Sequence, residues 1–433
     1  MRRHDGPAHG NCLVQRNTDR LPSVNPALAF LLAARRSEIR ALEQLRATGD
    51  LVRGMSEWVH RLQHERGASN LFLGSRGQRF ATERLQCVDD SKALEEAMRA
   101  RHFQPGADPG ATFGGMRLLS RIAQMLHAVD SLPRLRKRVA QRALTPEQAT
   151  RCYSECIAAM LAVVFEAADT AADPGVSRAL VALFNLMQGK ELAGQERAAG
   201  TAAFAAAQFD AATQQRLAHL VEAQERCFQI FQEFAQPGLQ AIWAGLLAGS
   251  ETRELQALRQ LLRDGGAARL AADTAERWFA AATRRMDAMR GVEDAATSAL
   301  VALCEARLAQ AQAELPALAE AAAPAGAVSL MFSPDHGVLD TAGLGPQLGR
   351  SLLDLLQAQA QRLQTMGDEL LAAQTSLRER KLVERAKGLL MDRRGLGEEA
   401  AYKLLRQTAM QQNRRLGEVA ESVLQMGPLI EGL

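Results

Sequence analysis

Apolar residues between positions 27 and 312 recur every three to four residues, which is the period of an amphipathic α-helix. Runs that alternate strictly between apolar and polar residues, as strands do, are absent. Gly and Pro clusters interrupt the helical pattern, most clearly at 104–110, 172–175, 236–238 and 264–266. Many helices with short connections are typical of antiparallel bundles, so we predict an all-α fold. The length of the helical region, residues 27–320, suits two four-helix bundles.

The pattern changes after residue 320. Residues 321–346 contain many Ala, Gly and Pro residues and have no helical period, which is typical of a flexible interdomain linker. In residues 347–376 leucine then recurs every seven residues, at Leu356, Leu363 and Leu370. This spacing predicts a short coiled-coil helix, although an amphipathic helix packed within its own chain would give the same pattern. A leucine seam that follows a flexible linker would be exposed to solvent in a single chain. We therefore favour the coiled coil and expect a homodimer.

The composition is ordinary for a globular protein, with 47% apolar and 23% charged residues in a chain of 433. No apolar stretch approaches the roughly 18 residues that a membrane span needs. The cysteines are scattered and suggest unpaired thiols in a reducing compartment, so we expect a cytoplasmic protein without membrane partners. They are Cys12, Cys87, Cys152, Cys156, Cys227 and Cys304.

Positive charge is concentrated near the C-terminus. The whole chain has a net charge of +3, but residues 378–415 hold eleven Lys or Arg and five Asp or Glu, a local charge of +6. A basic segment on an otherwise slightly acidic chain is typical of a site for a polyanion. A solvated surface of mixed charge is the alternative interpretation.

The same basic segment contains an ordered motif. Residues 382–424 read LVERAKGLLMDRRGLGEEAAYKLLRQTAMQQNRRLGEVAESVL. This stretch resembles the ANTAR family, a three-helix RNA-binding module of transcription antiterminators. The resemblance implies an RNA-binding domain over residues 377–433 that binds hairpins in leader transcripts. The matching features are Ala386–Gly388, Leu390–Met391, Gly395–Leu396, Glu399–Tyr402, Leu405–Arg406, Ala409–Met410, Arg414–Leu416 and Val419–Ala420.

The residues of this segment predict how it folds and which side chains contact RNA. An apolar stripe that includes Ala386 and Leu390 predicts one helix, and Gly395 ends it. Tyr402 is suited to stacking on an unpaired base, or equally to a place in the core. Basic side chains at the edges of the stripes are free to reach phosphate. The candidate RNA-binding residues are Arg385, Lys387, Tyr402, Arg406 and Arg414.

The N-terminal region carries a second resemblance, through Leu62–Leu73, Asn185–Ala198 and Trp278–Asp287. These segments are similar to the NIT family, a helical domain that senses nitrate and nitrite, and the similarity covers about residues 45–300. NIT followed by ANTAR is the arrangement of nitrate-responsive antiterminators that switch on nitrate-assimilation operons. The resemblance therefore implies a one-component regulator in which nitrate or nitrite is the effector and leader RNA is the target.

Arginines of the N-terminal region differ in whether their own helix neutralises them. Residues three and four positions away share a helix face, and Arg66, Arg197 and Arg285 have no acid at those positions. Such arginines reach solvent, pair with an acid on another helix, or hold an anion. Nitrate is planar and suits the planar donors of guanidinium groups. The resemblance to the NIT family favours the anion among these three possibilities, and on that ground we expect nitrate binding by Arg66, Arg197 and Arg285.

Two further arginines have an acid on their own helix face. Arg226 lies four residues after Glu222 and is a weaker candidate for the nitrate site. Arg284 lies three residues before Asp287, and we expect these two to pair.

Catalytic and metal-binding patterns are thin. His60 and His64 have the spacing of a metal pair on a helix, but no third ligand is evident, and we interpret them as helix-surface residues. No phosphate loop or nucleophile motif occurs, so we expect neither an enzyme nor a bound metal or cofactor. The alternatives are a regulator that senses another small anion or metabolite, a helical enzyme, and a coiled-coil scaffold.

Overall fold

The fold is taken from a computed structural model. It describes residues 26–104, 106–206, 210–263, 273–321, 331–332, 339–340, 379, 381–412 and 414–426.

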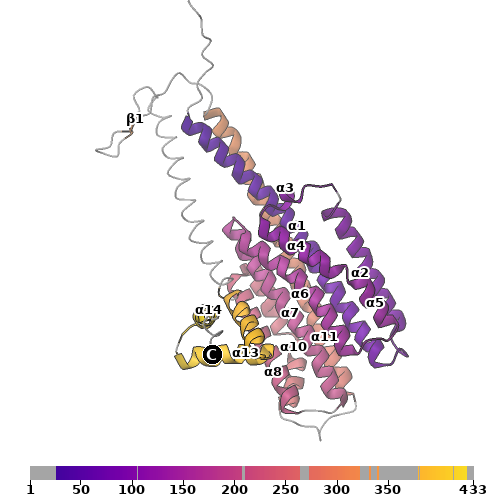
Figure 1. The fold of residues 1–433 in the computed structure, drawn as a ribbon. Helices are drawn as coiled ribbons and strands as arrows, with labels where there is room; N and C mark the ends of the chain where they lie inside the picture. The colour runs from indigo at the N-terminus through magenta and orange to yellow at the C-terminus, as the bar shows by residue number, and fades with distance from the viewer. Residues whose placement is uncertain are drawn as a thin grey trace, which may run out of the picture. The chain divides into compact units, whose positions relative to one another are not determined.

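The described chain is almost entirely helical, as the sequence predicts (Figure 1). The exception is an antiparallel pair of two-residue strands, β1 (Met331–Phe332) and β2 (Leu339–Asp340). The helices of the N-terminal region are α1 (Pro26–Gly74), α2 (Ala81–His102), α3 (Pro109–Phe113), α4 (Met116–Val129), α5 (Leu132–Ala140), α6 (Pro146–Thr170), α7 (Pro174–Ala206), α8 (Ala211–Phe234), α9 (Pro237–Leu247), α10 (Ser250–Arg263) and α11 (Thr274–Ala321).

The chain divides into two compact units. One unit joins residues 1–38 with 311–358 and contains the start of α1, the end of α11 and the two strands. Arg35, which is buried, forms ion pairs there with Glu38 and Glu314. The other unit joins residues 39–310 with 359–433 and contains the candidate functional residues.

Proline fixes where several helices begin. Five of the described helices start with this residue, whose ring presets the helical φ and whose missing N–H has no partner in a first turn (α1, α3, α6, α7 and α9). At α6, Thr145 and Gln148 add a capping box in which each side chain accepts a hydrogen bond from the other's backbone N–H. Helix breaks predicted at 104–110, 172–175 and 236–238 are thereby confirmed.

Helices α1, α7 and α11 are long and bring distant parts of the sequence together. The first two contribute Trp58 and Leu183 to a core that also includes Ile157 of α6. Near its C-terminal end, α7 packs in a separate apolar cluster with α8, α10 and α11. The ring of Trp278 on α11 lies 5.4 Å from that of Phe204 in this cluster. Helix α7 therefore takes part in two cores, and polar side chains on it can face partners on either side.

The C-terminal segment forms three helices around one small core. Residues 381–394 are helical, and α13 (Glu398–Gln412) and α14 (Leu416–Met426) follow. Ala386, Leu405 and Val419, one from each helix, are buried together. Gly395 has φ +62° directly after the first helix, which confirms the predicted helix end, because other residues rarely adopt that conformation.

Three expectations from the sequence lie on residues that the structure does not describe, and the first is the helix break at 264–266. The coiled-coil helix at 347–376 is entirely outside the described residues, and most of the linker at 321–346 is as well. A dimer through that seam therefore stays a prediction.

Among the described helices, none combines the length and the apolar character that crossing a membrane requires.

Glycine permits the close contact between α7 and α11. A Cβ at Gly200 would lie 2.2 Å from the indole of Trp278, so Gly200→Ala forces the two helices apart. We predict a loss of about 1–3 kcal/mol in the free energy of unfolding, measured by urea denaturation. Gly245→Ala is the control, because nothing lies within 4 Å of that position on α9. The control is expected to stabilise the protein by up to about 1 kcal/mol through helix propensity. Equal effects of both substitutions would contradict this packing.

Candidate functional site

Two of the predicted arginines meet between α1 and α7. A Cβ on Gly67, next to Arg66, would lie 3.1 Å from Nη2 of Arg197. Reciprocally, a Cβ on Gly194 would lie 2.6 Å from Nη2 of Arg66. Each guanidinium thus occupies the space that a glycine of the opposite helix leaves open. Two like charges are brought together in the interior, which is unfavourable without an anion.

Arg66 is already neutralised, by an acid on another helix. Its Nη1 and Nη2 donate to Oε1 and Oε2 of Glu191 on α7, at 2.5 and 3.1 Å. Nη1 also donates to Oγ of Ser154 on α6, at 2.7 Å. Both members of the ion pair are almost fully buried. Arg66 therefore belongs to a structural ion pair with Glu191. This pair holds one of the two arginines in place.

Arg197 has no such partner. Its Nη1 donates to Oγ of Thr283 on α11, at 2.9 Å, and its guanidinium lies 4.9 Å from the ring centroid of Phe279. Within the described part of the chain no carboxylate forms an ion pair with it, although the side chain is only 7% exposed. Burial and the neighbouring charge of Arg66 lower the pKa of Arg197 to about 10. The group stays charged at neutral pH, and Asp287 and Glu191 act on it only from a distance, without forming an ion pair.

The backbone of Arg197 is fixed as well. Nε1 of Trp278 donates to its carbonyl oxygen, at 3.0 Å, and ties α11 to this turn of α7. The guanidinium is therefore presented from a rigid position.

Arg285 is buried but lies in a different setting. Its Nη1 donates to Oε1 of Gln224 at 3.3 Å, and its Nε has no hydrogen-bond partner among the described residues. Burial and the charge of Arg259 lower its pKa to about 10. Arg259 itself pairs with Glu196. The structure therefore groups Arg285 with α8 and α10 and does not bring it to the Arg66–Arg197 pair.

Arg226 and Arg284, the other two arginines considered from the sequence, lie at the surface. Arg226 is paired with Glu222 at 3.8 Å, as its spacing predicts, and lies apart from the arginine pair. The expected pairing of Arg284 with Asp287 is wrong, because Arg284 pairs at 2.6 Å with Glu254 on α10. Helix packing brings Glu254 of α10 to Arg284, and Asp287 on the same helix as Arg284 does not form the pair.

His60 and His64 are stacked edge to face, with ring centroids 4.5 Å apart. Burial and the nearby Lys190 lower the pKa of His60 to about 2, so this ring is neutral. No set of three metal-ligating side chains occurs among the described residues.

The predicted RNA-binding residues of the C-terminal helices are partly engaged within their own domain. Arg385 is exposed, whereas Lys387 is largely buried and pairs with Glu384 at 3.0 Å. Arg414 lies 3.4 Å from Glu418. Lys387 therefore reaches phosphate only if it leaves its pair.

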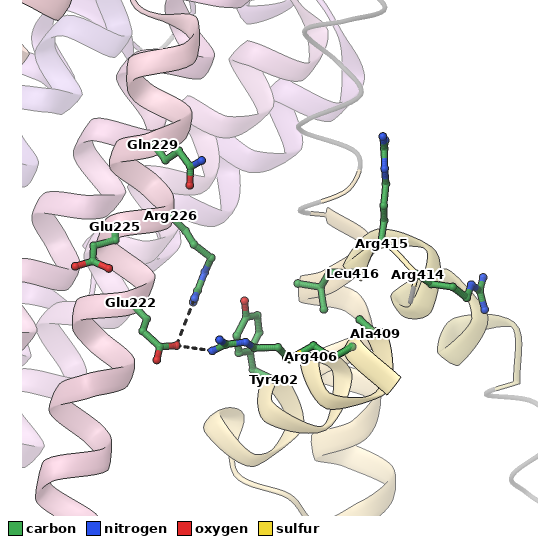
Figure 2. Close-up of a pocket in the computed structure, with 11 residues that line it drawn as sticks. Glu222, Glu225, Arg226, Gln229, Tyr402, Arg406, Ala409, Arg414, Arg415 and Leu416 are labelled. Atoms are coloured by element: carbon green, nitrogen blue, oxygen red, sulfur yellow. Dashed lines mark hydrogen bonds and ion pairs between the residues drawn. The ribbon is translucent and has the colours of Figure 1, made fainter. Parts of the chain in front are cut away.

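Tyr402 and Arg406 contact α8 (Figure 2). Arg406 donates to Oε2 of Glu222 at 2.7 Å, and Arg226 lies over the ring of Tyr402 at 4.7 Å. His219 meets the same ring edge to face at 5.8 Å. Tyr402 is thus neither a fully buried core residue nor free for a base. Two residues that we expect to bind RNA are held by the N-terminal region in this structure.

Comparisons with known proteins match two segments of the chain to known families. Residues 57–301 match the family model "Nitrate and nitrite sensing", and residues 371–424 match that of the ANTAR domain. The chain is 36% identical over 395 residues to the nitrate regulatory protein of Klebsiella oxytoca, covering 90% of this chain and 93% of that protein. The solved structure of the NasR transcription antiterminator is similar with a TM-score of 0.55 and 33% identity, over 94% of this chain and all of that one.

The chain belongs to the family of nitrate-responsive antiterminators with NIT and ANTAR domains.

The acid of the NIT domain that faces Arg66 cannot be predicted from helix spacing. Glu191 lies 125 positions further along the chain, so spacing within one helix gives no sign of the contact. The signal that was present is Glu191 and Arg197 within the same NIT-like segment, six residues apart on α7. That spacing does not predict that Glu191 forms an ion pair with Arg66 and leaves Arg197 without one.

Substitutions of Arg66 and Arg197 are expected to change the free energy of unfolding differently. Arg66→Met leaves Glu191 buried without its main partner, and we predict a loss of about 3–5 kcal/mol in the free energy of unfolding. Arg197→Met removes an uncompensated buried charge, so stability is expected to stay the same or rise. Urea denaturation at neutral pH in nitrate-free buffer measures both. Equal destabilisation by the two substitutions would show that Arg197 has a compensating partner.

Proposed function

We propose that this antiterminator binds nitrate or nitrite between Arg66 and Arg197 and responds by binding leader-RNA hairpins. The observation that carries the proposal is the buried, uncompensated charge of Arg197 beside Arg66. A buried charge of this kind destabilises the protein unless an anion neutralises it. An anion that binds the folded protein at this point supplies the missing negative charge and so stabilises the folded state.

Nitrate has the chemistry for this position. It is a planar monoanion with three equivalent oxygens, and guanidinium groups donate in a plane. The Oγ of Thr283 lies at the same place and adds a hydroxyl. The names of the similar proteins support nitrate over another small anion or metabolite as the effector.

The contact between α13 and α8 bears on how the protein would bind RNA. Arg406 and Tyr402 are bound to Glu222 and Arg226, so RNA binding through them requires this contact to open. The ion pair is about half exposed on both sides, and exposed pairs contribute only about 0–1 kcal/mol. A small change in α8 on nitrate binding is enough to shift such an equilibrium.

We further infer that the protein acts as a regulator without turnover of its ligand, and that it works as a homodimer. The first inference follows from a regulatory family, and the second from the leucine seam at 347–376.

Nitrate binding is tested by calorimetry on the full-length protein. Wild type is expected to release or absorb heat with nitrate and to show none with chloride at equal concentration. Arg197→Met should weaken nitrate binding by at least about 1.5–3 kcal/mol, the size of a charge-assisted hydrogen bond. Arg284→Met is the control, because this exposed arginine pairs with Glu254 and faces away from the site. If both variants bind nitrate as tightly as wild type, the site lies elsewhere.

The contact with α8 is tested by RNA binding without nitrate. Glu222→Gln removes the ion pair with Arg406 and leaves Arg406 itself intact. We predict that this variant binds a hairpin RNA up to about fivefold more tightly than wild type in nitrate-free buffer. Glu225→Gln lowers the negative charge of the same helix, but no ion pair of Glu225 occurs among the described residues, so it should resemble wild type. Equal nitrate-free affinities for wild type and Glu222→Gln would contradict the role of this contact.

A further inference from the structure

The buried charges at the arginine pair do not balance. Arg66 and Arg197 supply two positive charges, and Glu191 supplies one buried negative charge. Asp287 also acts on Arg197, but its side chain is 54% exposed and is screened by solvent. The buried triad of Arg66, Arg197 and Glu191 is therefore left with a charge of +1. One monovalent anion neutralises it.

Glu191 is held firmly enough to keep its place when an anion enters. Beyond the two bonds from Arg66, its carboxylate accepts hydrogen bonds from Nε2 of Gln63 and Nε2 of Gln195, both at 3.0 Å. Ser154 adds a longer contact at 3.4 Å. Displacing the carboxylate would leave these buried and partly buried donors without their acceptor, at a cost for each. Arg197 is the group with unused charge, so an anion that approaches it need not compete with Glu191.

We propose that Glu191 is a specificity-determining residue, whose charge restricts the site to monovalent anions and excludes divalent ones such as sulfate. A divalent anion would leave the buried triad with a net negative charge in surroundings where charge is expensive. This inference rests on the proposed nitrate site and names what sets its selectivity.

Charge can be separated from shape in the wild-type protein. Perchlorate and sulfate are both tetrahedral, but perchlorate carries half of the charge. In competition calorimetry with nitrate on the full-length protein, we expect perchlorate to displace nitrate and sulfate to do so at least about tenfold less well. Sulfate and perchlorate that compete equally, or fail equally, would overturn the proposal.

The second arm changes the charge of the triad itself. Glu191→Gln keeps the size of the side chain and raises the buried charge to +2, which suits a divalent anion. We expect sulfate to gain at least about tenfold in affinity relative to nitrate. The matched control is Glu196→Gln, the same substitution on the same helix, since Glu196 is also buried and bound to an arginine, Arg259. The control should keep the wild-type preference.

The outcomes distinguish this inference from the function that it rests on. If wild type binds no nitrate, the proposed function fails. If wild type binds nitrate but Glu191→Gln keeps the wild-type preference while remaining folded by circular dichroism, only the role of Glu191 fails. A changed preference in Glu196→Gln would instead place the anion near Arg285 and overturn the proposal. The perchlorate and sulfate comparison needs no variant and decides the question if Glu191→Gln is unstable.

Discussion

A guanidinium that is buried without an ion pair to a carboxylate is the constraint on which the proposed sensor depends. Arg197 lies beside Arg66, in a space that Gly67 and Gly194 leave open, and burial lowers its pKa to about 10. A protein interior normally pairs such a charge, because charge in a low dielectric is costly. Here the buried acid beside the two arginines, Glu191, forms its ion pair with Arg66. Under the proposed function, an anion that binds beside Arg197 would offset this cost, because it would neutralise the buried charge.

Helix α7 connects this site to the rest of the molecule. It carries Glu191 towards α1 and α6, Arg197 towards α1 and α11, and Glu196 towards Arg259 on α10. Glu196 also accepts a hydrogen bond from Gln224 of α8, the helix whose outer face holds Arg406 of the ANTAR domain. A continuous set of packed and hydrogen-bonded groups therefore runs from the proposed anion site to α8. Such continuity is a route for coupling, and the weak contact at Glu222 is the element that two states would differ in.

The sequence predicts the architecture better than it predicts the charges. The all-α fold, the breaks at proline clusters and the helix end at Gly395 follow from local rules and agree with the structure. Both families are recognisable from ordered motifs. Ion pairs are different, because they form between helices: Glu191 with Arg66 and Glu254 with Arg284 join residues that no spacing rule connects. Counting acids on an arginine's own helix identified Arg197 correctly as unpaired, but it gave the same result for Arg66.

The anion's position is the most direct test of this account. A crystal structure of the full-length protein with nitrate should show a planar anion within hydrogen-bond distance of the guanidinium of Arg197. Glu191 should still be bound to Arg66 in that complex. Nitrate bound beside Arg285 or on the surface, with the space at Arg197 empty, would contradict the claim that an uncompensated buried arginine is the sensor.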